Sequence, residues 1–138
     1  MKKKIPFFDY PRLWNDNKEE FIKIIDEIFS EVGFILQKAL NDFETQLANY
    51  TKSKYFVGVG NATDAMEIFL QAIGINKGDE IIISSHTMIA TASAIKVVGA
   101  IPVPVDIGED NLICANSIEE AITSRTVGIM PSQLNGRV

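Results

Sequence analysis

The fold is decided by residues 80–105, which read EIIISSHTMIATASAIKVVGAIPVPV. Two short runs rich in apolar and β-branched residues, Glu80–Ser84 and Ile101–Val105, predict strands. The stretch between them, Thr87–Val98, predicts a helix. A strand, a helix and a strand in this order predict a crossover unit with parallel strands, because parallel pairing needs a long connection. Strands that are apolar at nearly every position are typical of a sheet covered on both faces.

The same alternation continues on both sides of this unit. Upstream, Tyr55–Val59 is a β-rich run, and Asn61 or Thr63 can cap a following helix that carries apolar residues from 65 to 73. Downstream, Ser117 and Glu120 have the capping-box spacing of a helix start, and Val127–Met130 predicts a last strand.

Together these elements predict an α/β fold, a three-layer sandwich with a mostly parallel sheet. Such sheets bind ligands beyond the C-terminal ends of their strands. The stretches to search for function are therefore residues 60–64, 84–88, 106–108 and 131–136.

The N-terminal third has a different pattern. Residues 5–16 are rich in proline and aromatic residues and predict an extended arm. Residues 21–32 have apolar side chains at amphipathic-helix spacing, and Gly33 is a suitable helix end. A second helical stripe runs from Leu36 to Tyr50.

Composition excludes several classes of protein. Hydrophobic residues make up 46% and charged residues 22% of the 138 residues, which argues against disorder. The formal charge of −5 argues against general nucleic-acid binding. The basic Met1–Lys4 run is not followed by the apolar segment of a secretory signal, and no run of about 18 apolar residues predicts a membrane span. We therefore expect a cytoplasmic protein, in which the single Cys114 is a buried structural thiol rather than a nucleophile.

The first candidate site is the turn at residues 58–64, GVGNATD, between the predicted strand and helix. Backbone amides at a helix start suit a phosphate, and the Thr63 hydroxyl adds a donor. The same turn is equally compatible with an N-cap and no ligand. It lacks the Gly-Lys-Ser/Thr of a Walker loop, and Thr63 stands where a dinucleotide fingerprint has its third glycine.

The other candidates also follow predicted strands. His86, in the run from Ser84 to Ala92, is the only histidine of the chain. A lone histidine is more often a structural residue than a catalyst, although its titration range makes catalysis possible. Asp106 is expected to cap the next turn. The polar segment from Pro131 to Arg137 predicts a loop. No carboxylate pair has acid/base spacing, and no Cys/His cluster has metal-ligand spacing.

Six short motifs follow one another in a fixed order: Phe43-Glu44 with Tyr50, Val57–Ala65, Gly74–Glu80, Ser85–Ile95, Gly99–Val103 and Val105–Ile107. In this order they resemble the DegT/DnrJ/StrS aminotransferases, whose usual forms are close to N-G-T-D-A-L, G-D-E-V and S-x-T-F-x-A-T. The resemblance covers about residues 5 to 138. It implies the fold type I class of transferases that use pyridoxal 5′-phosphate (PLP). It also implies amino transfer, usually from glutamate, to a nucleotide-linked keto-sugar for the biosynthesis of a surface polysaccharide or a modified glycan.

The resemblance also implies site residues. Those assigned to the cofactor are Asn61, Ala62, Thr63, Asp64, His86 and Met88, and those assigned to the substrate are Gln133 and Asn135. Three positions depart from the family. Ala62 replaces a glycine, Met88 replaces an aromatic residue that covers the PLP ring, and Gln133 replaces the histidine of V-H-L-Y-G. Either Met88 or His86 is expected to cover the ring, Met88 through its polarizable sulfur.

The family's Schiff-base lysine has no counterpart here, because none of the ten lysines lies in a matching context. Such an enzyme needs that lysine to hold the cofactor covalently and to move a proton. We therefore expect residues 1–35 to be an arm and amphipathic helix, residues 36–138 to be part of the PLP-binding large domain, and the chain alone to be inactive. The family implies a homodimer. Two alternatives remain: a nucleotide- or dinucleotide-binding module using Gly58 and Gly60 with Asp79 or Glu80 on the ribose, and a non-catalytic regulator on the same scaffold.

Overall fold

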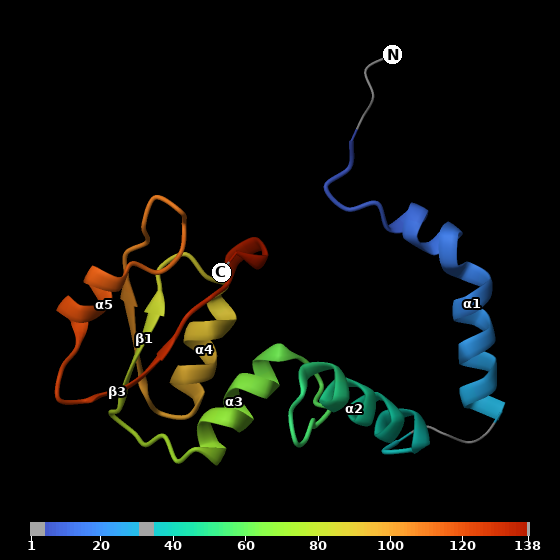
Figure 1. The fold of residues 1–138 in the computed structure, drawn as a ribbon, viewed down its shortest axis with the longest axis horizontal. Coiled ribbons are helices and arrows are strands. Elements are labelled where there is room, and N and C mark those ends of the chain that lie inside the picture. The colour runs from blue at the N-terminus through green and yellow to red at the C-terminus, as the bar shows by residue number, and fades with distance from the viewer. Residues whose placement is uncertain (1–4, 31–34, 138) are drawn as a thin grey trace. The chain divides into compact units, whose positions relative to one another are not determined.

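The computed structural model describes residues 5–30 and 35–137, and the chain divides into two compact units, residues 1–58 and 59–138 (Figure 1). The predictions made for Met1–Lys4 and for a helix end at Gly33 lie outside the described residues.

The first unit contains helices α1 (Tyr10–Ser30) and α2 (Lys38–Thr51). Helix α1 starts within the segment expected to be an extended arm, so that prediction is wrong from Tyr10 onward. Asp9 accounts for the early start, because its Oδ1 accepts a hydrogen bond from the backbone amide of Arg12 at 3.2 Å. Pro11 is tolerated there because the first turn of a helix needs no amide donor at that position.

The β-rich run Tyr55–Val59 is not a strand in the structure. Its backbone has other partners: the amide of Gly58 donates to Glu44 Oε1 at 2.7 Å, and the ring of Phe56 meets Phe43 edge to face. A strand is stable only when a neighbouring strand takes up its backbone groups, and no strand of the described sheet pairs with this run. The strand prediction is therefore wrong.

The second unit is a three-layer α/β sandwich, as predicted. Strands β1 (Glu80–Ser84), β2 (Ile101–Val105) and β3 (Thr126–Met130) form a parallel sheet in the order β2-β1-β3. Helices α3 (Ala62–Ala72) and α4 (Ile89–Val97) cover one face, and α5 (Ala115–Ala121) covers the other (Figure 1). The chain steps from β1 to β2 and then crosses back over β1 to reach β3.

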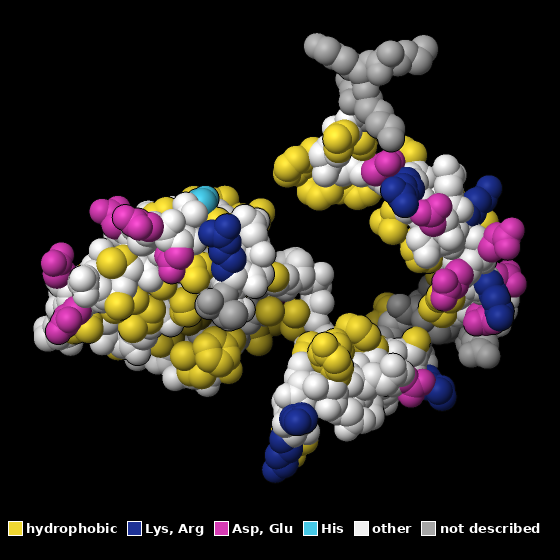
Figure 2. All heavy atoms as spheres, turned by 45° about the horizontal axis from the view of Figure 1, so that its top comes forward, with side chains coloured by type: hydrophobic (Ala, Val, Ile, Leu, Met, Phe, Trp, Pro, Cys, Tyr) yellow, Lys and Arg dark blue, Asp and Glu magenta, His cyan; other side chains and the backbone are white. Residues whose placement is uncertain are grey.

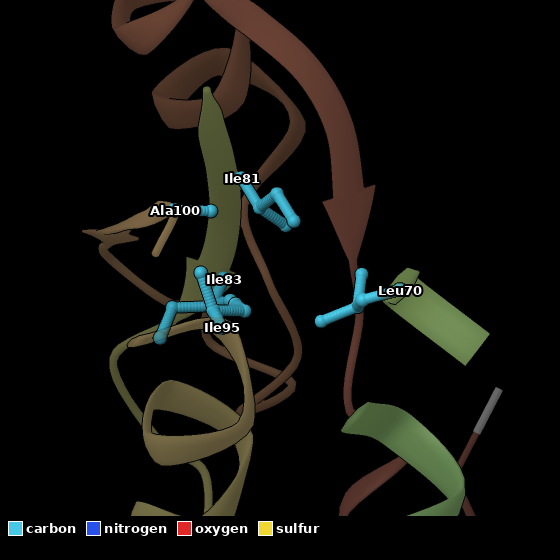
Figure 3. Close-up of a cluster of buried hydrophobic side chains, with 5 residues drawn as sticks. All are labelled: Leu70, Ile81, Ile83, Ile95 and Ala100. Carbon is cyan, nitrogen blue, oxygen red and sulfur yellow. The ribbon is translucent and has the colours of Figure 1, made fainter. Parts of the chain in front are cut away.

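The core lies between the sheet and the helices α3 and α4. Leu70 of α3 and Ile95 of α4 pack with Ile81 and Ile83 of β1, and Ala100 completes the cluster (Figure 3). Burying one such side chain contributes about 1.5–3 kcal/mol, so this cluster fixes both helices on β1.

A polar network holds together the end of the sheet at which the strands begin. The Glu80 side chain is only 6% exposed, and its carboxylate pairs with the guanidinium of Arg125 and accepts a hydrogen bond from the hydroxyl of Thr123. The backbone amide of Glu80 also donates to the carbonyl of Arg125 at 2.8 Å. A buried carboxylate needs partners of this kind, and here they join the starts of β1 and β3.

Two helix starts are decided by the structure. Asn61, one of the two candidates, is the N-cap of α3. Helix α5 begins at Ala115 after Cys114, so the predicted start at Ser117 is wrong and Ser117 lies in the first turn. A short 3-10 turn, Leu134–Gly136, ends the described chain. No helix in the described ranges has the length and apolar character needed to cross a membrane.

Candidate functional site

The strand order places a candidate site at the carboxyl ends of β1 and β3. The connection from β1 leads to β2, on the side away from β3, so the order of strands reverses between β1 and β3. In open α/β sheets, ligands bind outside the strand ends at such a reversal. The loop after β1 carries Ser85–Met88, and the loop after β3 carries Ser132 and Gln133.

The turn before α3 is closed by the side chain of Asn61. Its Oδ1 accepts hydrogen bonds from the amides of Thr63 at 2.9 Å and Asp64 at 3.0 Å. Its Nδ2 donates to the Asp64 carboxylate at 3.0 Å. The cap therefore uses two of the amides that a phosphate would need at this helix start.

The turn nevertheless has the donors that a phosphate group requires. Asn61 and Ala62 are exposed, and Thr63 is half-buried and brings a hydroxyl. Helix geometry leaves the amide of Ala62 without an intrahelical acceptor. The carboxylate of Asp64 in the same first turn opposes an anion, since like charges repel. The donor set fits a phosphate once Asn61 Oδ1 releases the two amides.

The loop after β1 is fixed by hydroxyl groups. Ser84 is 1% exposed, and its Oγ accepts a hydrogen bond from the amide of His86 at 3.2 Å. The His86 side chain is exposed, and the chain's one histidine is visible at the surface in Figure 2. Met88 follows two residues later with 73% of its surface exposed.

Three hydroxyl groups meet where the two loops face each other. Thr87 Oγ1 lies 2.6 Å from Ser132 Oγ and 2.9 Å from Thr91 Oγ1. Thr91, on the first turn of α4, is 7% exposed. The structure thus joins two predicted site segments that are 45 residues apart in sequence. The sequence placed both segments at strand ends but did not identify this contact. The one sequence feature that could have indicated it is the hydroxyl residue in each loop.

A shallow hollow of about 310 Å³ lies beside the first of these loops. Its lining is mostly apolar and includes Met88 and Ile89 from the start of α4 and Pro102 and Pro104 from β2.

The remaining predicted residues are exposed. Gln133 and Asn135 lie in and beside the 3-10 turn, where Asn135 adopts a left-handed backbone conformation with φ 55°. Asp106 was expected to cap the turn after β2. The capping carboxylate there is instead Asp110, whose Oδ1 accepts from the amide of Leu112 at 3.0 Å.

Cys114 is half-buried at the start of α5, so the expectation of a buried thiol is wrong. Hydrogen bonds from the Ser117 amide, the Ser117 side chain and the Asn116 amide lower the pKa of this thiol below its ordinary value. Across the described part of the chain, no group of three His, Cys, Asp or Glu side chains is arranged to hold a metal ion.

Comparison with known proteins accounts for this architecture. Residues 15–138 match the DegT/DnrJ/EryC1/StrS aminotransferase family. The chain belongs to this family. It is 36% identical over 135 residues to a pleiotropic regulatory protein of Geobacillus stearothermophilus, covering 97% of the chain and 36% of that protein. It is 34% identical over 134 residues to dTDP-3-amino-3,4,6-trideoxy-alpha-D-glucose transaminase of Streptomyces venezuelae, covering 96% of the chain and 35% of that enzyme.

Two solved structures of family members superimpose closely. Streptomyces venezuelae DesV, in complex with a ketimine intermediate, gives a TM-score of 0.92 at 33% identity over 99% of the chain and 37% of its own. Bacillus subtilis NtdA, with the cofactor PMP bound, gives 0.90 at 34% identity over 97% of the chain and 31% of its own. The chain thus spans about a third of the length of the relatives it matches.

The alternative of a dinucleotide-binding module, with Asp79 or Glu80 on the ribose, is not supported by the structure. The Asp79 carboxylate accepts a hydrogen bond from the Asn76 amide at 2.7 Å within a turn. Glu80 begins β1 at the end of the sheet opposite to the ligand edge and is paired with Arg125. Neither carboxylate lies at a strand's C-terminal end, where a ribose would be bound.

Proposed function

We propose that the chain forms part of a PLP-dependent aminotransferase that transfers an amino group from glutamate to a nucleotide-linked keto-sugar. Family membership carries this proposal, together with the Streptomyces venezuelae relative, which is a transaminase of a dTDP-linked amino sugar. The order β2-β1-β3 supports it, because the predicted cofactor and substrate segments then lie at one edge of the sheet.

In this proposal each segment has a separate task. The amides of Ala62 and Thr63 and the Thr63 hydroxyl hold the cofactor phosphate, and the α3 dipole favours its charge. Met88 covers one face of the pyridine ring, with His86 beside it. Gln133 and Asn135 contact the sugar substrate. When bound, PLP supplies the electron-withdrawing ring and the aldehyde carbon through which an amino group is transferred.

The phosphate assignment can be tested on the chain itself with pyridoxine 5′-phosphate. This ligand lacks the aldehyde of PLP, so binding cannot be confused with adducts on surface lysines. Calorimetry should detect binding of pyridoxine 5′-phosphate and none of pyridoxine. Thr63→Val should weaken binding about tenfold, because one charge-assisted hydrogen bond is worth about 1.5–3 kcal/mol.

Thr45→Val is the matched control, since Thr45 is exposed on α2 and its hydroxyl donates to the Asn41 carbonyl within the helix. Equal binding of pyridoxine 5′-phosphate and pyridoxine, or binding of neither, would contradict the phosphate assignment. A parallel titration with NAD addresses the dinucleotide alternative, which requires NAD to bind and pyridoxine 5′-phosphate not to bind.

A regulator on the aminotransferase scaffold is the second candidate function. The 36% identity to a pleiotropic regulatory protein favours it. We also propose that the whole protein is a homodimer. The apolar side chains exposed along α1, among them Phe21, Ile24 and Ile25, suit such a contact. Light scattering on a purified sample gives the mass that decides this point.

A further inference from the structure

The loop between β1 and α4 is held at its start by bonds within the second unit. The Ser85 amide donates to the Val105 carbonyl at 2.9 Å, which extends the pairing of β1 with β2 by one residue. The buried Ser84 hydroxyl then accepts from the His86 amide. The backbone is therefore fixed up to the residue before Thr87.

The other end of the loop is held by the Thr87 hydroxyl. A hydroxyl has one proton to donate and two lone pairs that accept, so Thr87 can bond to Thr91 and Ser132 at once. Thr91 belongs to α4, and Ser132 belongs to the loop after β3. One side chain thus links the β1 loop to the helix that follows it and to the next strand's exit.

This link is the one that spans the strand reversal. Past Ser84 and Met130, the bond between Thr87 and Ser132 is the only hydrogen bond among the described residues that joins the loop 85–88 to the loop 131–133. Met88 follows Thr87 and Gln133 follows Ser132 in the sequence. The bond therefore links the backbone segments that carry these two residues.

The backbone of Met88 is the part that this link can hold. A methionine side chain has three rotatable bonds and adapts its shape, so its neighbours fix where it starts and not its whole course. That backbone is held by the Met88 carbonyl, which accepts from the Thr91 amide at 3.1 Å, and by Thr87 immediately before it. With 73% of its surface exposed, Met88 has little packing of its own.

We propose that Thr87 is a positioning residue that, through Ser132, fixes the backbones of Met88 and Gln133 relative to each other. The cofactor-covering and substrate-binding sides of the site then keep a constant separation. The assignment of ligands to Met88 and Gln133 rests on the proposed function, whereas the mechanical coupling of the two residues does not.

The coupling is tested first without ligand, by NMR of the chain labelled at methionine methyl groups and glutamine side-chain amides. Thr87→Val keeps the branched shape and removes the hydroxyl, and Ser132→Ala removes its partner. Each should shift the Met88 methyl and the Gln133 amide signals together, and the double variant should shift them no further. Thr87→Ser, which keeps the hydroxyl, should restore the original spectrum. Met66 on α3 serves as the internal reference.

The functional consequence is tested with pyridoxine 5′-phosphate. Ser132→Ala should weaken binding about fivefold, the usual worth of one hydrogen bond. Thr87→Val also loses the bond to Thr91, so it should weaken binding at least as much, and the double variant should match Thr87→Val. Thr45→Val should bind as the original chain does. Met88 and Gln133 signals that stay in place in Thr87→Val, or that move independently of each other, would overturn the inference.

The two proposals fail separately. A chain that does not bind pyridoxine 5′-phosphate contradicts the proposed function, while the ligand-free spectra still decide the coupling. A chain that binds the ligand equally well with and without the Thr87 hydroxyl contradicts the positioning role and leaves the proposed function standing.

Discussion

Asn61 Oδ1 lies 2.9 Å from the backbone nitrogen of Thr63 and accepts its hydrogen bond. The same oxygen accepts from the Asp64 amide, so the cap that starts α3 uses donors of the proposed phosphate site. A phosphate must displace this oxygen before it can use both amides. An N-cap of this type is worth about 1 kcal/mol, which is the cost that phosphate binding has to offset.

We therefore expect Asn61→Ala to have opposite effects on folding and binding. The variant should lose about 1 kcal/mol of unfolding free energy in urea, because the cap is removed. It should bind pyridoxine 5′-phosphate up to about fivefold more tightly, because the amides are already free. Asn49→Ala, at an exposed position of α2, is the control: it should leave binding unchanged and should not lower the free energy of unfolding, because alanine favours a helix. Weaker binding by Asn61→Ala would mean that the Asn61 side chain contacts the phosphate instead of competing with it.

The network at the start of the sheet predicts a larger loss of stability. Arg125→Ala leaves the Glu80 carboxylate buried without its cation, and we expect the free energy of unfolding to fall by about 1–3 kcal/mol. The exposed Arg125 side chain keeps this below the cost for a fully buried pair. Arg12→Ala, which breaks an exposed pair with Asp16, should cost less than about 0.5 kcal/mol.

A double-mutant cycle separates the pair from the single residues. Arg125→Ala is made both in the original chain and in Glu80→Gln. If it lowers the free energy of unfolding by the same amount in both, the ion pair contributes nothing and the prediction fails.

Strands β1 and β2 were predictable because their signal is local: short apolar runs rich in β-branched residues between turns. The run Tyr55–Val59 has the same local signal and forms no strand, because pairing depends on a neighbour that local sequence does not specify. The start of α1 depended on Asp9, a capping residue that the aromatic and proline content of the segment obscured.

The site was predictable in its segments and not in its contacts. Residues 84–88 and 131–136 were placed at strand ends from the alternation of elements alone. The bond between Thr87 and Ser132 requires β3 to lie beside β1 rather than beside β2, and that order is a tertiary property. The closure of the α3 turn by Asn61 was half predicted, since the choice between Asn61 and Thr63 as the cap needed coordinates.

The thiol of Cys114 predicts a pH dependence of alkylation. Its pKa is lowered mainly by the Ser117 amide and then by the Ser117 side chain, so the reactive thiolate should persist to a lower pH than in an unperturbed cysteine. The rate of reaction with iodoacetamide, followed against pH, gives the midpoint. Ser117→Ala should move this midpoint upward, toward the ordinary value, because one hydrogen bond to the thiolate is lost.

The backbone amides of residues 116 and 117 remain in that variant, so part of the lowering should remain as well. Ser124→Ala, at an exposed position outside α5, is the control. A rate profile that is the same in the original chain and in Ser117→Ala would contradict the assigned cause.

The β2 edge of the sheet is protected against the addition of another strand. The Ile101 amide donates to the Asp79 carbonyl at 2.8 Å, so residues 101, 103 and 105 face β1 and the alternate positions 102 and 104 face outward. Both outward positions are proline, which has no amide to donate, and β2 is thereby closed to another strand.

We expect the double variant Pro102→Thr with Pro104→Thr, which restores two backbone donors, to associate several-fold faster in light scattering and thioflavin fluorescence. Pro131→Thr, outside the strands, is the control, and both variants are compared at urea concentrations that give equal fractions unfolded, so that lost stability alone cannot explain the difference. Association of the double variant at the control's rate would show that the prolines do not protect this edge.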